Sequence, residues 1–256
     1  MEIHFLGTHN TETRSSRLSS IIIDGRLALD AGSITSNLSL DEQLGLKAVV
    51  LTHGHYDHIR DVPLLAMNFY LNEATVDIYS IDAVREVLSG YLMNGVMYPD
   101  FFKRPEGKQT LKFNQVEPYK ETDIAGYRVL ALPTSHSVPS VGYQVIDCEG
   151  HSIYYAGDTG PGLGSIWADI RPEVLIIEVT APDRFEEFGR ESKHLTPSLL
   201  GEELIGFEKS NGYLPRVICV HMNPPLEKEI AGEIALLSKE LGCQISLAYE
   251  GMRISL

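Results

Sequence analysis

The sequence is poor in the features that mark secreted, disulfide-bonded and membrane proteins. Its three cysteines, Cys148, Cys219 and Cys243, are odd in number and widely spaced, which favours reduced thiols over a disulfide framework. It has no run of eighteen apolar residues, and it opens on a strand-like stretch at 2–6 instead of a basic, apolar leader. We therefore expect a cytoplasmic protein with no membrane partner.

Positive charge is also scarce. Lysine and arginine total 21 against 35 aspartates and glutamates, and the formal net charge is −14. Proteins that bind long nucleic acids usually carry a basic surface, because phosphate contacts supply most of the affinity. The acidic balance therefore argues against a large nucleic acid as a partner. A small anion could still bind at a local positive site.

The sequence does contain enough apolar material for one substantial core. Of its 256 residues, 43% are hydrophobic and 22% are charged, as in ordinary globular domains. Strand-like runs dominate both halves, helical patterns lie between them, and no linker, repeat or low-complexity tract divides the chain. We predict a single mixed α/β domain over residues 1–256.

Apolar and alternating runs, bounded by turn residues, locate the expected elements. Strands are expected at 2–6, 19–23, 27–29, 47–51, 76–79, 111–116, 127–132, 141–146, 152–156, 174–177 and 217–220. Helices are expected at 41–46, 61–69, 82–88, 196–209 and 226–241, with a helical turn after 165. A terminal strand pair is expected around Ile245 and Met252.

One short stretch organises the rest of the chain. His53, His55, Asp57 and His58 directly follow the apolar run 47–51. Imidazoles and a carboxylate are the ligands that a borderline-soft divalent ion such as zinc selects. The chain has only nine histidines, so chance is a poor explanation for three within six residues. The stretch therefore predicts a metal site at the end of a buried strand.

Four further residues are candidates to complete that site. His136, Asp158 and His221 each follow a strand-like run, and His194 lies just before a helix that Thr196 could cap. A single histidine after a strand is more often an ordinary surface or core residue. The common placement of these residues at the ends of elements makes coincidence a poor account of all of them.

Two other regions have open interpretations. Arg14 and Arg17 lie in a Ser/Thr-rich loop, which either contacts an anion through the guanidinium groups or is a solvated turn. The aromatic and methionine-rich segment 91–109 has two interpretations. It either covers a pocket or makes a subunit contact, or it packs irregularly into the core. Asp30, at a strand end, could orient neighbouring ligand loops through hydrogen bonds.

The motifs together resemble a known family. The pattern His53-x-His55-x-Asp57-His58, followed by His136, Asp158 and His221, resembles the metallo-β-lactamase superfamily, and Asp30 matches its first motif. Within it, the motifs Phe5-Leu6-Gly7-Thr8, Gly157-Asp158-Thr159 and His194-Leu195-Thr196-Pro197 resemble the phosphodiesterase branch. That branch contains class II cyclic-nucleotide phosphodiesterases and ribonuclease Z-like transfer-RNA 3′-processing endonucleases. The resemblance implies a four-layer αββα sandwich with its site at one edge of the two sheets.

The resemblance also assigns roles to residues. It implies one divalent ion on His53, His55 and His136, a second on Asp57, His58 and His221, and Asp158 bridging both. Zinc is the implied metal, with manganese or iron as alternatives, and the pair would activate water and hold phosphoryl oxygens. The implied catalytic residues are His194, which would stabilise charge or protonate the leaving oxygen, and Asp57. Asp30 and Thr52 would support the ligands, while Arg14, Arg17 and Thr159 would contact substrate.

The spacing of two motifs bears on the substrate. Only 21 residues separate His136 from Asp158, whereas the transfer-RNA endonucleases usually carry a long basic arm between these motifs. We therefore predict hydrolysis of a small phosphodiester, a 3′,5′-cyclic nucleotide, to the 5′-monophosphate. The alternatives are a lactone, ester or thioester hydrolase of the same fold, a transfer-RNA endonuclease, or a binding protein with a decayed site. The aromatic segment and the habits of the relatives favour a homodimer.

Overall fold

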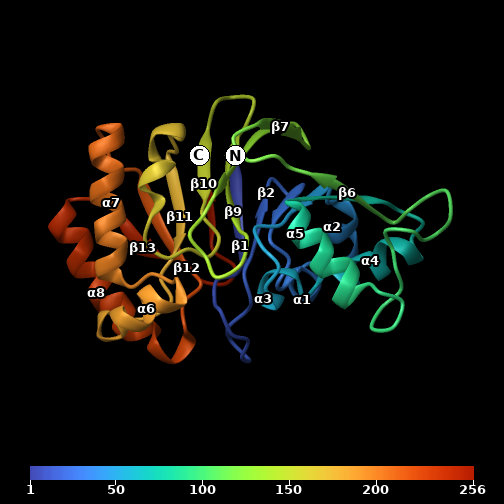
Figure 1. Cartoon of the computed structure of the whole chain (residues 1–256), viewed down its shortest axis with the longest axis horizontal. Coiled ribbons are helices and arrows are strands. Elements are labelled where there is room, and N and C mark those ends of the chain that lie inside the picture. Colours follow the sequence, from blue (N-terminus) through green and yellow to red (C-terminus); the bar gives the residue numbers. More distant parts are fainter.

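The computed structural model describes residues 1–256 as two seven-stranded mixed sheets with helices on their outer faces (Figure 1). The first sheet has the order β14 (Arg253–Ser255), β1 (Glu2–Gly7), β2 (Ser20–Ile23), β3 (Leu27–Leu29), β4 (Ala48–Val50), β5 (Val76–Ser80), β6 (Leu111–Gln115). The second has the order β13 (Ile245–Leu247), β12 (Arg216–Val220), β11 (Val174–Glu178), β10 (Ser152–Tyr155), β9 (Val141–Ile146), β8 (Tyr127–Pro133), β7 (Glu121–Ile124).

The helices form the two outer layers. Those of the first half are α1 (Ile34–Asn37), α2 (Leu40–Gly45), α3 (Tyr56–Ile59), α4 (Val62–Leu71) and α5 (Asp82–Val87), which continues into a π-helical turn, Leu88–Leu92. Those of the second half are α6 (Glu186–Ser192), α7 (Pro197–Asn211) and α8 (Glu227–Leu241). Short 3₁₀ turns occur at Leu163–Ser165, Trp167–Asp169, Asp183–Phe185 and Pro224–Leu226. In Figure 1, α4 and α5 lie on one outer side of the sheets and α7 and α8 on the other.

Three apolar clusters hold these layers together. One lies between the sheets and joins residues of both, such as Phe5 and Ile218. A second, which includes Trp167 and Phe207, packs the second sheet against α7 and α8, and a third packs the first sheet against α4 and α5. Strands such as β11 are buried along their whole length, because apolar layers cover both of their faces. The predicted αββα sandwich is therefore confirmed.

Most predicted elements are present at nearly the expected bounds, and three differences are informative. The strands around Ile245 and Met252 do not pair, because β13 joins β12 in the second sheet and β14 joins β1 in the first. The prediction of a terminal pair was therefore wrong. Strand β7 and helix α6 were not predicted, since both are short and polar, with burial patterns that lack a continuous apolar face.

The segment 91–109 packs partly into the core, as one of its two interpretations expects, while a role in covering a pocket or a subunit contact stays a prediction. Met93 and Phe101 are buried in the cluster under the first sheet, whereas Tyr91, Val96 and Met97 are 71%, 89% and 69% exposed. Leu92, Tyr98 and Phe102 are partly buried against the same cluster, so the segment lies at the boundary between core and solvent. The three cysteines are free thiols, two of them buried. No helix combines the length and apolar character needed to cross a membrane.

The direction of the central strands positions the site. Strands β3, β4, β5 and β6 are mutually parallel in one sheet, as are β10, β11, β12 and β13 in the other. In such sheets the loops after the carboxyl ends of the strands meet at one edge and form the usual ligand site. The candidate ligands follow the ends of β4, β8, β10 and β12, so they converge at this edge.

Candidate metal centre

The first ligand cluster grows out of the end of β4. The strand ends at Val50, and His53 follows in an extended segment that carries no Cβ at Gly54. A side chain there would collide with Val87 of α5, whose Cγ2 would lie 2.9 Å from the added Cβ. The glycine therefore lets the ligand loop pass close to α5. His55 then precedes the single turn of α3, which carries Asp57 and His58.

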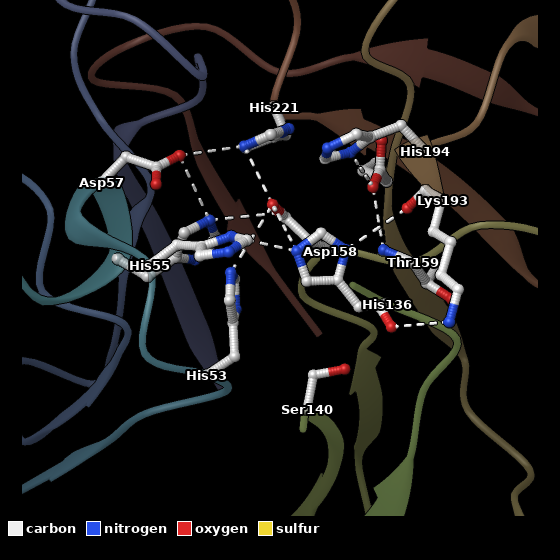
Figure 2. A network of polar contacts seen from close by, with 12 residues as sticks. His53, His55, Asp57, His136, Ser140, Asp158, Thr159, Lys193, His194 and His221 are labelled. Carbon is white, nitrogen blue, oxygen red and sulfur yellow. Dashed lines mark hydrogen bonds and ion pairs between the residues drawn. The ribbon is translucent and has the colours of Figure 1, made fainter. Parts of the chain in front are cut away.

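Two groups of ligand atoms form, and they share Asp158. One contains His53, His55, His136 and Asp158, and the other contains Asp57, His58, Asp158 and His221; the ligand atoms within each lie within 4.8 Å of one another. Figure 2 shows the labelled members, His53, His55, Asp57, His136 and His221, gathered around Asp158. The structure thus brings all seven predicted ligands together in the predicted grouping.

The individual distances are those of side chains around a common centre. In the first group, Nε2 of His136 lies 3.0 Å from Nδ1 of His55, and Nε2 of His53 lies 3.7 Å from Oδ2 of Asp158. In the second, Nε2 of His221 lies 3.1 Å from Oδ2 of Asp57 and 3.2 Å from Oδ2 of Asp158. Each group offers nitrogen and oxygen ligands to one centre.

Unsatisfied atoms show that the site suits cations. Nε2 of His53, Nε2 of His58 and Oδ1 of Asp158 are buried and make no hydrogen bond. Nε2 of His58 approaches Oδ1 of Asp158 to 3.1 Å, but without the alignment of a hydrogen bond. A buried polar atom without a partner costs about 1–3 kcal/mol, so such atoms usually face a ligand. All three face the ligand groups, and divalent ions would supply their partners.

The protonation states of His53, His55, His136 and Asp158 match metal binding. Burial, with help from the neighbouring His58, lowers the pKa of His53 well below its ordinary value, so the ring is neutral. Burial likewise lowers the pKa of His55 and His136. Burial raises the pKa of Asp158, but His221 and His58 outweigh it and lower the pKa well below the ordinary value. Neutral imidazoles beside an ionised carboxylate are what a divalent ion requires. Burial lowers the pKa of His58, but Asp158 and Asp30 outweigh it and raise the pKa well above its ordinary value, so a metal ion would have to displace that proton.

Asp30 orients His58 directly and His53 through Thr52. It is fully buried after β3, and its Oδ2 accepts hydrogen bonds from Nδ1 of His58 at 2.7 Å and from the hydroxyl of Tyr155 at 2.8 Å. Thr52 donates its hydroxyl to the same carboxylate at 2.9 Å and contacts Nδ1 of His53 at 3.0 Å. Both Nδ1 atoms are engaged, which leaves both Nε2 atoms for a metal.

Glu178 repeats this arrangement on the second sheet. It ends β11, is fully buried, and accepts a hydrogen bond from Nδ1 of His194 at 2.8 Å. Thr180 donates its hydroxyl to Glu178 at 2.6 Å and contacts Nδ1 of His221 at 2.9 Å. A buried carboxylate and a threonine thus orient two imidazoles in each half of the site.

His194 lies at the rim of the second ligand group. Its ring stacks on that of His221, with centroids 5.5 Å apart and an interplanar angle of 13°. Burial lowers the pKa of His194, but the charge and the hydrogen bond of Glu178 outweigh it and raise the pKa to about 9. The ring is therefore a cation at neutral pH, with a proton on each nitrogen. Because Nδ1 donates to Glu178, the second proton is on Nε2.

Lys193 ties this rim to the first ligand group. Its Nζ donates to the backbone oxygen of His136 at 2.9 Å, and its own backbone oxygen lies 3.3 Å from Nδ1 of His136. Lys193 has φ 59°, a left-handed conformation that ends α6 and turns the chain into His194. One residue thus positions a candidate ligand and the loop that carries His194.

Comparison with known proteins identifies the family. Residues 27–222 match the family described as the Beta-lactamase superfamily domain. The chain belongs to the β-lactamase superfamily. A 3′,5′-cyclic-nucleotide phosphodiesterase of Aliivibrio fischeri is 28% identical over 233 residues, which cover 72% of this chain and 67% of that protein. A ribonuclease Z of Methanocaldococcus jannaschii is 30% identical over 233 residues, which cover 71% of this chain and 70% of that protein.

Two solved structures share the fold of this chain. Unliganded yeast PDE1 aligns with a TM-score of 0.84 at 17% identity, covering 100% of this chain and 99% of that one. Human tRNase Z, short form, aligns with a TM-score of 0.70 at 20% identity, covering 100% and 99%. The likeness at this identity concerns the fold alone. Together with the named relatives and the ligand clusters, the superfamily membership makes the chain a metal-dependent hydrolase.

The three predicted substrate contacts, Thr159, Arg14 and Arg17, are not among the residues of the two ligand groups. Thr159 is buried, donates its N–H to Glu178 at 2.8 Å and its hydroxyl to the oxygen of Gly160 at 2.9 Å. Arg17 directs its guanidinium to backbone oxygens of its own loop, including that of Thr13 at 2.6 Å. Arg14 is exposed in the same loop.

Sequence reasoning missed Glu178, Thr180 and Lys193. A signal for Glu178 was present, because a lone carboxylate closes an otherwise apolar strand, as candidate ligands close the others. Thr180 and Lys193 carry no such signal. Their roles depend on which distant side chains lie beside them.

Proposed function

We propose that this hydrolase is a dinuclear metal phosphodiesterase that converts a 3′,5′-cyclic nucleotide into the 5′-monophosphate. The observation that carries the proposal is the buried Glu178 beneath His194 at the rim of the ligand groups. Hydrolysis of an alkyl phosphodiester expels a poor leaving group, an alkoxide, which needs a proton as the bond to phosphorus breaks. The pair provides a protonated imidazole at that rim.

The ligand sets fit two divalent ions. His53, His55 and His136 would hold one, Asp57, His58 and His221 the other, and Asp158 both. The imidazole-rich set favours zinc, with manganese or iron as alternatives. Bound there, such ions lower the pKa of water and polarise the phosphoryl oxygens.

Asp57 and His194 would act on the two ends of the reaction, the attacking water and the departing oxygen. Burial raises the pKa of Asp57, but His58 and His221 outweigh it and hold the pKa below its ordinary value, so the carboxylate stays ionised. It can therefore accept a hydrogen bond from the attacking water. Nε2 of His194 donates its proton to the departing 3′ oxygen, and Glu178 stabilises the cationic ring before that transfer.

Two observations support a small substrate over RNA. The connection from His136 to Asp158 consists of β9, β10 and their short loops, which leaves no inserted arm. The net charge of −14 opposes binding of a long polyanion. The cyclic-nucleotide phosphodiesterase among the relatives agrees with this reading. The ribonuclease Z relatives support the second candidate, cleavage at the 3′ end of transfer-RNA precursors.

A substrate screen tests the proposal. Protein loaded separately with zinc, manganese or iron would be assayed on 3′,5′-cyclic AMP, a transfer-RNA precursor and a lactone, with products separated by chromatography. We expect adenosine 5′-monophosphate from cyclic AMP and no lactone hydrolysis. Cleavage of the precursor alone would favour the ribonuclease Z function. Hydrolysis of the lactone alone would overturn both phosphodiester functions.

A further inference from the structure

A groove of about 460 Å³ runs beside the candidate ligand His136. Its apolar wall is formed by Ile81, Pro118, Pro133, Val138 and Pro139. None of the ten residues that line it carries a formal charge, although the chain as a whole is 22% charged. The remaining lining residues include Thr134, Ser137 and Ser140. We call this feature the proline groove.

The loop 134–140, which forms one side of the proline groove, is firmly attached to the metal centre. It closes on itself through Thr134, whose N–H donates to the oxygen of Ser140 at 3.2 Å and whose hydroxyl lies 2.6 Å from that of Ser140. The same Thr134 hydroxyl donates to the backbone oxygen of Asp158 at 3.3 Å. Val141, directly after the loop, donates its N–H to the oxygen of Thr52 at 3.1 Å.

These bonds tie the groove to both sides of the ligand cluster, since Asp158 is the shared ligand and Thr52 precedes His53. A group bound in the groove would therefore lie at a set position relative to a phosphate at the centre. Proline rings add rigidity, because φ is locked. Such preorganisation lowers the cost of binding.

We propose that the proline groove binds the nucleobase of the substrate, an inference that rests on the proposed function. A 3′,5′-cyclic nucleotide has one anionic part, its phosphate, and one flat uncharged part, its base. The ligand groups suit the phosphate, and the uncharged apolar groove next to His136 suits the base. Its volume lies within the usual range of small-molecule sites, about 300–1,000 Å³. The hydroxyls of Thr134 and Ser140 bond each other, so the exposed Ser137 is the residue whose hydroxyl can bond the polar edge of the base.

A pair of matched substrates separates the base from the rest. 3′,5′-cyclic AMP would be compared with the 3′,5′-cyclic phosphate of 1-deoxyribose, which keeps the 2′-hydroxyl and the cyclic phosphate and has no base. The half-buried Val138 would be changed to Trp, which fills the groove, and to Ala, which removes part of its wall. Leu236→Trp, on the 70% exposed position of α8, controls for adding an indole.

The measured quantity is the ratio of kcat/KM on cyclic AMP to kcat/KM on the abasic substrate. We expect Val138→Trp to lower this ratio at least tenfold, because a misfit of a single methylene in an apolar pocket already costs about 10–200-fold. Val138→Ala, which only removes part of the wall, should lower the ratio by a smaller factor, and Leu236→Trp should leave it unchanged. A wild-type ratio near one, or a ratio that neither Val138 variant changes, would overturn the proposal.

A binding measurement distinguishes failure of this inference from failure of the proposed function. If the wild type hydrolyses neither cyclic phosphate, the proposed function fails. The groove is then judged by calorimetric titration of the zinc-loaded protein with adenosine 5′-monophosphate and ribose 5-phosphate. Weaker binding of the nucleotide alone by Val138→Trp would support a base site. Equal binding of the nucleotide by wild type and variant would overturn it.

Discussion

The carboxylate of the buried Glu178 and the imidazole of the half-buried His194 lie 2.8 Å apart at the rim of the metal centre. The pair joins the end of a central strand to the loop between α6 and α7. It mirrors Asp30 and His58, which are 2.7 Å apart on the other sheet. The difference between the two pairs is functional, because His58 directs Nε2 to the metal ligands whereas Nε2 of His194 remains available to a substrate.

The first prediction concerns Glu178→Gln. The change keeps the shape of the side chain but removes its charge, so the pKa of His194 should fall and the ring should lose its proton at neutral pH. We expect kcat/KM on cyclic AMP to drop by about 10²–10⁴, the usual contribution of a general acid. Bis(p-nitrophenyl) phosphate should lose much less, because its leaving group needs no proton. The alkaline limb of the pH profile should also move to lower pH.

His194→Ala should show the same contrast between substrates, with metal content unchanged as the control. Equal losses on both substrates would contradict the role of the pair in protonating the leaving group.

The second prediction concerns Asp30→Ala. The substitution leaves Nδ1 of His58 and the hydroxyl of Tyr155 buried without their acceptor. We expect the free energy of unfolding to fall by about 3–5 kcal/mol, as for one partner of a buried charged pair. Metal affinity, measured by competition with a chelator, should fall about 10–100-fold.

Asp30→Asn is the matched control for that substitution. Asparagine keeps the volume and tolerates the φ of 57° at this position. Its loss of stability should therefore be smaller. Wild-type metal affinity in Asp30→Ala would show that Asp30 does not orient the ligands.

The third prediction concerns the pH dependence of stability, which His9 and Glu250 control. Nδ1 of His9 lies 2.6 Å from the Glu250 carboxylate, and Nε2 lies 3.3 Å from that of Glu227. Burial lowers the pKa of His9, but Glu250 and Glu227 outweigh it and raise the pKa above its usual value. Burial raises the pKa of Glu250, but His9 and the N–H of Arg17 outweigh it and lower the pKa.

The raised histidine stabilises the fold fully below the unfolded value of about 6.5, and this contribution is lost as pH rises through the folded pKa. The lowered carboxylate contributes above about 4.3, and its contribution is lost as pH falls through the folded pKa. Urea unfolding should therefore show that His9→Gln costs most, about 1.5–3 kcal/mol, between roughly pH 4.3 and 6.5. Adding Glu250→Gln should produce little further change. A cost that is constant from pH 5 to 9 would contradict the ion pair.

The fourth prediction concerns removal of the metal. Without cations, Nε2 of His53 and of His58 remain buried without partners, and the carboxylates of Asp57 and Asp158 repel each other. We expect a chelator to lower Tm, and added zinc to restore it in a concentration-dependent way, because ligands that bind only the folded state stabilise it. Asp158→Asn should respond much less. A wild-type Tm that the chelator does not change would argue against bound metal.

The limits of sequence-based prediction follow from particular residues. The approximate positions of the central strands were predictable because their apolar runs are short and bounded by turn residues. The pairing of β13 and β14 was not, since neighbours in sequence can join different sheets when a glycine turn such as that at Gly251 separates them. The polar elements β7 and α6 carry too little apolar periodicity to be recognised.

By itself, the sequence determined a mixed α/β fold and the clustering of ligand-type residues at strand ends, because periodicity and spacing are local properties of the chain. The αββα sandwich followed from the resemblance of its motifs to a known family. Only the tertiary structure decided which carboxylate holds which imidazole. Glu178 and His194, Asp30 and His58, and Lys193 and His136 are separated by 16, 28 and 57 positions, and each pair is formed by the packing of different elements. The proline groove arises in the same way, since Ile81, Pro118 and Val138 share no local pattern and meet only where the strand-end loops converge.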